Sequence, residues 1–140
     1  MRLIHNLNLP LYFCLIMISL CSCNETSTHI YSPEKKLQAD SLIRNISNID
    51  TLQFVLEKFQ NEDNLEGQMV TLKKLGKQQR ELNKFADAID THTKGFDIAT
   101  ELCDTPEIVY ALNNIGTNYR RMSMLEDATT FHYRALRYCE

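Results

Sequence analysis

The sequence predicts an all-α protein made of stacked helical hairpins, for three reasons. Residues 75–96 and 115–136 align at a constant offset of 40 residues, with apolar facing apolar, small facing small, and His92 facing His132. A fixed period of this size is typical of stacked repeats. Proline and glycine number only three and four among 140 residues, which disfavours a turn-rich β architecture. No segment alternates polar and apolar residues for long enough to predict a strand.

The first 22 residues have the features of a secretory signal peptide. Arg2 and His5 precede an apolar run at residues 11–20, and no acidic residue occurs before Glu25. Ten apolar residues in a helix span about 15 Å, which is half of a hydrocarbon core. The run therefore predicts an export signal and not a permanent membrane span.

The residues that close this segment, Leu20-Cys21-Ser22-Cys23, resemble the lipobox of bacterial lipoproteins. The resemblance implies lipidation of Cys23 and a membrane-anchored protein of the bacterial cell envelope, periplasmic or on the outer surface. Cys21 departs from the pattern, because alanine, serine or threonine is usual there. An uncleaved signal anchor or an ordinary signal peptide is the alternative. Residues 23–32 are mostly polar and predict a tether between membrane and domain.

Helix-start signals recur along the rest of the chain. Ser32-Pro33-Glu34 places a cap residue before a proline, and residues 50–53 and 63–66 have capping-box spacing. The apolar stripes expected for the first two helices are Leu37, Leu42, Ile43 and Ile46, and then Leu52, Val55, Leu56 and Phe59. Later stripes are expected at Met69, Leu72, Leu75, Gln79 and Leu82, and at Val109, Leu112, Ile115, Tyr119 and Met122. These patterns predict about six helices of roughly 12–19 residues, joined by short connections as in antiparallel hairpins.

Two glycines lie at equivalent mid-helix positions of the matched segments. Glycine costs about 1 kcal/mol relative to alanine in a helix interior, so Gly76 and Gly116 are best explained by a neighbouring helix lying against each. Ala88 and Ala128 occupy the matching face of the partner helix and are expected to meet them. The expected organisation is a degenerate hairpin at residues 33–62, followed by repeats at 63–104 and 105–140.

These positions resemble the tetratricopeptide repeat family. The matching residues are Leu72, Leu75, Gly76, Leu82, Phe85, Ala88 and Gly95 in the first unit, and Leu112, Ile115, Gly116, Tyr119, Leu125, Ala128 and Ala135 in the second. The 40-residue period departs from the usual 34 and is similar to the longer-helix variants of kinesin light chains and bacterial regulators. The resemblance covers about residues 64–140. It implies a right-handed α-solenoid whose first helices line a concave groove for peptides or partner proteins.

The resemblance also implies which side chains face that groove. They are Val70, Lys73, Lys77, Arg80, Glu81, Tyr110, Asn113, Asn114, Thr117, Arg120 and Arg121. Lys73, Lys77 and Arg80 project together at i, i+4 and i+7 and predict an acidic peptide or C-terminal carboxylate as ligand. Lys73 and Asn114 resemble the carboxylate clamp of chaperone-binding repeats. An ordinary solvated face is the alternative for any one of these residues.

Other functional classes find little support in the sequence. The net charge is −3 with both signs interspersed, which disfavours nucleic acid. His92 and His132 are expected about 8–10 Å apart on successive hairpins, too far to share a zinc ion, so both are interpreted as structural. We expect no metal, no cofactor and no catalytic constellation. Cys103 and Cys139 are interpreted as small buried hydrophobes, with a disulfide between them as the alternative.

The C-terminal residues 131–140 stop at a repeat helix without a terminal capping helix. This pattern predicts either further repeats in a longer protein or self-association through that end. The function predicted by all of these features is a non-catalytic scaffold that binds protein or peptide. The alternative is the extracytoplasmic sensor region of a membrane-spanning signalling or transcription-regulatory protein.

Overall fold

The computed structural model describes residues 29–139, and within this range the chain forms six helices and no strand. They are α2 (Pro33–Ile43), α3 (Ile49–Asn61), α4 (Leu65–Glu81), α5 (Phe85–Glu101), α6 (Thr105–Arg121) and α7 (Leu125–Arg137). The all-α prediction is confirmed. The expected signal peptide at 1–22, the lipidated Cys23 and most of the expected tether lie outside the described residues.

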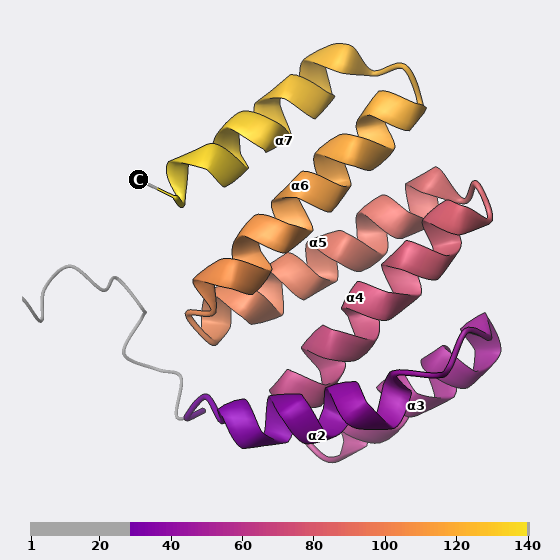
Figure 1. Ribbon diagram of the computed structural model, residues 1–140, viewed down its shortest axis with the longest axis vertical. Helices are drawn as coiled ribbons and strands as arrows, with labels where there is room; N and C mark the ends of the chain where they lie inside the picture. Colours follow the sequence, from indigo (N-terminus) through magenta and orange to yellow (C-terminus); the bar gives the residue numbers. More distant parts are fainter. Residues whose placement is uncertain (1–28, 140) are drawn as a thin grey trace, which may run out of the picture.

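The helices pack in chain order, as Figure 1 shows. From α4 to α7 each helix lies against the next, and α2 and α3 both pack on α4. The short three-residue connections reverse the chain direction at each step from α3 onward. Helix α4 therefore has three neighbours and forms the centre of the N-terminal half.

Four identical turns explain the 40-residue period. The middle residue of each turn has a positive φ of 48° to 62°, namely Asp63, Asn83, Cys103 and Ser123. Each turn is a Schellman motif: Asn83 N–H donates to the Arg80 carbonyl and Lys84 N–H to the Gln79 carbonyl, and the other three turns repeat both bonds. The residue that completes each motif is also the N-cap of the following helix. Two 17-residue helices and two three-residue turns therefore make one period.

Side-chain capping of the helix N-termini alternates from α4 to α7. Asn64 accepts the N–H of Gly67, and Asp104 accepts the N–H of Glu107, so α4 and α6 are capped by side chains. The N-cap residues of α5 and α7 make no such bond. The second helix starts two residues earlier than the capping-box pattern predicts, because Asn48 accepts the N–H of Thr51 and fixes the start at residue 49.

The core confirms the stripes of α3, α4 and α6 more fully than that of α2. Leu52, Val55 and Phe59 are buried against α4 as expected. In α2, however, the buried residues are Ala39 and Ile43, one turn apart on the face that meets α4. The predicted stripe is wrong for Leu37 and Leu42, which are 65% and 57% exposed. Leu82 and Met122, at the ends of their helices, are also exposed.

The mid-helix glycines lie against a neighbouring helix, but their partner is histidine. A Cβ atom on Gly76 would lie 2.6 Å from His92 Cε1, and one on Gly116 would lie 3.0 Å from His132 Cε1. The nearest side chain to each glycine is therefore histidine and not the expected alanine. For Gly116 the expected partner is also close, because the Ala128 carbonyl oxygen would lie 3.1 Å from the added Cβ atom. The same helix contact recurs in both units, which explains why histidine repeats at the 40-residue offset.

Candidate functional site

A polar recess of the N-terminal half lies between α2 and α4, and we call it the α2–α4 hollow. Its lining residues are Asp40, Ile43, Arg44, Asn45, Ile46 and Ser47, then Val70, Lys73, Lys74, Lys77 and Gln78, and Tyr110. They come from α2 and the connection after it, from α4, and from α6. The cavity volume is about 370 Å³, which falls within the range of protein ligand pockets.

A second recess opens beside it at the N-terminal end of α2. It has a volume of about 490 Å³ and shares Asp40, Val70 and Lys73 with the α2–α4 hollow. Its remaining lining residues are Tyr31, Pro33, Lys36, Leu37 and Glu107. The two recesses therefore run along one continuous face between α2 and α6, with α4 as the floor.

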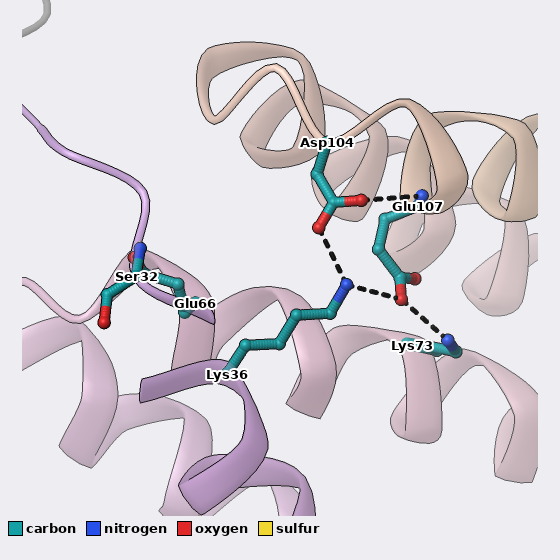
Figure 2. A network of polar contacts seen from close by, with 6 residues as sticks. All are labelled: Ser32, Lys36, Glu66, Lys73, Asp104 and Glu107. Carbon is teal, nitrogen blue, oxygen red and sulfur yellow. Dashed lines mark hydrogen bonds and ion pairs between the residues drawn. The ribbon is translucent and has the colours of Figure 1, made fainter. Parts of the chain in front are cut away.

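A network of ion pairs joins α2, α4 and α6 across this face (Figure 2). Lys36 Nζ lies 2.7 Å from Asp104 Oδ2 and 3.1 Å from Glu107 Oε1, while Lys73 Nζ lies 2.9 Å from the same Glu107 oxygen. The side chains of Asp104 and Glu107 are only 5% and 10% exposed. These are partly desolvated pairs, in which losing one partner is expensive because the remaining charge stays buried.

The pKa directions agree with this geometry. Burial opposes the ionised form of Lys36, but hydrogen bonds to Asp104 and Glu107 outweigh it and raise the pKa of the ammonium group. Burial likewise opposes ionisation of Asp104, yet Lys36 and the backbone N–H of Glu107 hold the pKa of this carboxyl below its usual range. Both groups are therefore charged at neutral pH, and the network is a true set of ion pairs.

Three further contacts extend the network along the wall formed by α4 and α6. The Lys73 ammonium lies 4.3 Å from the centre of the Tyr110 ring, a cation–π distance. Burial raises the pKa of the Tyr110 hydroxyl. Further towards the C-terminal ends of α4 and α6, Arg80 donates to the Asn114 side-chain oxygen. The Asn114 side-chain amide in turn donates to the Tyr110 carbonyl oxygen. Lys73, Arg80, Tyr110 and Asn114 thus already have partners within the chain.

The predicted groove residues fall into two groups. Val70, Lys73, Lys77 and Tyr110 line the α2–α4 hollow together, with Val70 buried in the floor. The others lie further along α4 and α6, namely Arg80, Asn113, Asn114, Thr117 and Arg120. Asn113 is exposed and its side-chain oxygen lies 3.1 Å from His132 Nδ1. Thr117 donates to the Asn113 carbonyl, and Arg120 is exposed on α6.

Several site residues escaped the sequence reasoning. Arg44 and Lys74 line the hollow, and Lys74 Nζ donates to the Arg44 carbonyl oxygen. Lys36, Asp104 and Glu107 build the ion network. Asp104 carried one usable signal, because an acid directly before Thr-Pro-Glu is a good N-cap residue. The sequence holds no local sign of the Lys36–Asp104 pair, which joins residues 68 positions apart.

The residues just before α2 are fixed to the folded body. The Glu66 side chain is fully buried; it accepts the Ser32 N–H at 2.6 Å, and its other oxygen lies 3.1 Å from His29 Nε2. Burial opposes the ionised form, but the N–H groups of Ser32 and of Glu66 itself, together with His29, lower the pKa of Glu66. His29 and Ser32, assigned to the tether by the sequence, are therefore held to α4 through Glu66, while Ile30 between them is exposed.

The histidine and cysteine interpretations have mixed outcomes. His92 is buried, and burial together with the Arg80 charge lowers its pKa to about 4, so it is a neutral packing residue. Among the described residues, no group of three His, Cys, Asp or Glu side chains is arranged to hold a metal ion. Cys139 is free and exposed, so it does not pair with Cys103. The expected burial is wrong for both, because Cys103 occupies an exposed turn.

Known proteins offer no relative with which this site can be compared. No family model, curated protein or solved structure matches the chain. Between residues 29 and 139, no helix has both the length and the apolar character needed to cross a bilayer. The candidate site is therefore argued from its own residues.

Proposed function

We propose that this chain is a non-catalytic helical-repeat scaffold of the tetratricopeptide type, which binds a segment of another polypeptide along the face between α2 and α6. In this proposal the hairpins form a right-handed α-solenoid. The first helix of each hairpin, α2, α4 and α6, lines the binding face.

The repetition of backbone detail supports the solenoid. Schellman turns recur every 20 residues, and the glycine–histidine contact recurs at an offset of 40. A helix pair that repeats its turn, its capping and its closest contact also repeats its packing rotation, which is the condition for a superhelix.

The single observation that carries the binding proposal is the composition of the α2–α4 hollow. Three helices contribute to it, and it combines an apolar floor at Val70 and Ile43 with the aromatic ring of Tyr110 and several exposed polar side chains. Recesses with an apolar base and a few polar groups at the rim are the usual form of ligand sites. No nucleophile–base pair accompanies these residues, which favours binding over catalysis.

The proposed location is the bacterial cell envelope. It rests on the export signal at residues 1–22 and on the lipobox resemblance ending at Cys23. In this arrangement the lipid anchor would hold the scaffold at the membrane, with His29 and Ser32 held to α4 through Glu66.

Photo-crosslinking in cells tests the binding proposal. A benzoylphenylalanine residue replaces Ser47, which is exposed at the rim of the hollow, in the full-length chain. The control carries it at Glu57, which is exposed on α3 outside both recesses. We expect adducts with another polypeptide from position 47 and none from position 57. Equal adduct yields, or none from position 47, would refute a polypeptide ligand in this hollow.

A further inference from the structure

The basic side chains of the α2–α4 hollow differ in how firmly each is neutralised by the chain itself. Four line it, Arg44, Lys73, Lys74 and Lys77, against the single acid Asp40. The whole chain carries a net charge of −3. A positive recess on an acidic protein is therefore a local feature and does not follow from bulk composition.

Lys73 is the basic residue least available to a ligand. Its ammonium group holds the largely buried Glu107 at 2.9 Å and lies over the Tyr110 ring. A ligand carboxylate would have to displace Glu107, leaving that acid partly desolvated with fewer partners. Lys73 therefore belongs to the frame of the hollow.

The other three basic residues keep their charge available. Lys77 is 3.9 Å from Glu81, and Arg44 is 3.8 Å from Asp40, and all four side chains are more than half exposed. Exposed pairs at such distances contribute little and exchange readily. Among the described residues, Lys74 contacts the Arg44 carbonyl instead of a carboxylate, and an ammonium group retains two further N–H donors after that bond.

We propose that the α2–α4 hollow binds a polypeptide segment that is both apolar and acidic. Its apolar side chain would lie against Ile46 and the Tyr110 ring, above the buried Val70 and Ile43. Its carboxylates would meet Arg44, Lys74 and Lys77. This inference rests on the proposed function and assigns its ligand class. A concave recess with an apolar base favours a chain segment over a flat anionic membrane, because only a segment can place side chains at its floor.

Titration calorimetry of the full-length chain with three synthetic peptides tests this assignment. The peptides share the same leucines and carry glutamate, glutamine or lysine at every other position. We expect the glutamate peptide to bind at least about tenfold more tightly than the lysine peptide, with an affinity that falls as salt is raised.

A matched pair of variants locates the site. Lys77→Glu should weaken the glutamate peptide by about three- to tenfold, which corresponds to the reversal of one exposed charge contact. Lys58→Glu is the control, since Lys58 is also 3.9 Å from the acid four residues later and equally exposed, but lies on α3 outside the hollow. It should leave the affinity unchanged.

Each other outcome overturns the inference in a recognisable way. Equal affinities for the three peptides, together with adducts from position 47, would overturn the acidic ligand and leave the polypeptide-binding proposal standing. Equal losses in the Lys77 and Lys58 variants would overturn the location. If the chain bound phosphatidylglycerol vesicles and none of the peptides, the basic residues of the hollow would be assigned to a membrane surface. If position 47 also gave no adducts, the proposed function would be refuted as well.

Discussion

Replacing each mid-helix glycine by alanine tests the helix packing that creates the repeat. A Cβ atom at position 76 would lie 2.6 Å from His92 Cε1, well inside van der Waals contact. At position 95, also mid-helix, the nearest atom would be Leu72 Cβ at 3.8 Å, an ordinary contact. The two substitutions are chemically identical and differ only in the space available.

The expected magnitude follows from that difference. Alanine gains about 1 kcal/mol over glycine in a helix interior at either position, so this gain cancels when the two variants are compared. Gly76→Ala additionally requires the buried His92 ring to move, and overpacking of this kind costs about 1–3 kcal/mol. Gly95→Ala should therefore be more stable than Gly76→Ala by about 1–3 kcal/mol. Gly116→Ala should fall between them, because His132 is partly exposed and has room to turn away.

Urea denaturation followed by circular dichroism measures these differences directly. One kcal/mol corresponds to a shift of about 4 °C in Tm for a domain of this size, so thermal melts serve as a second readout. Equal stability of Gly76→Ala and Gly95→Ala would refute the close contact between α4 and the His92 ring.

Two further predictions concern buried charge. The pKa of His92 is about 4 in the folded state, below its ordinary value of 6.5. Between these two pH values the unfolded chain binds a proton that the folded chain does not. The contribution of His92 to the free energy of unfolding is therefore complete above pH 6.5 and falls by about 3 kcal/mol as the pH decreases to 4. Urea titrations at several pH values should show that the free energy of unfolding decreases with pH. The His92→Leu variant should lack this dependence above roughly pH 5, where carboxyl groups remain ionised. An unchanged pH dependence in the variant would contradict the assignment of His92 as a buried neutral residue. In the ion network, a double-mutant cycle of Lys36→Met with Asp104→Asn should give a coupling free energy of about 1–3 kcal/mol in urea denaturation. Asparagine preserves the α6 cap, so a coupling within error of zero would mean that the Lys36–Asp104 pair contributes nothing.

The helices were predictable because their signals are local. The stripe at Leu52, Val55 and Phe59 is read within one helix, and it is buried as expected. The Schellman turns were harder to recognise, since none has glycine at the residue with positive φ, and Cys103 and Ser123 are unusual there. The stripe of α2 failed because the face that this helix buries against α4 contains Ala39 and Ile43, and nothing within its own sequence identifies that face.

Part of the site could be predicted from helical spacing, which places Lys73 and Lys77 on one face of α4, and part from the repeat period. Val70 and Tyr110 occupy the same slot of two successive units, 40 residues apart, and both line the α2–α4 hollow. Three and seven residues further along, the basic side chains of α4 are replaced by neutral ones in α6, because Lys73 is matched by Asn113 and Lys77 by Thr117.

The repeat therefore continues the shape of the wall from α4 to α6. Two lysines of α4 have neutral counterparts on α6, while Arg80 is matched by Arg120. Arg44 and Lys74 add positive charge beside α2. Arg44 was missed because it lies outside the matched units, whereas Lys74 lies within α4 and reaches the hollow through a contact with Arg44, 30 positions earlier in the chain. A ligand in the α2–α4 hollow would consequently meet Arg44, Lys74 and Lys77 near α2, and the neutral Asn113 and Thr117 further along α6, before Arg120. In the proposed complex, this distribution of charge favours an acidic segment that lies with its carboxylates towards α2.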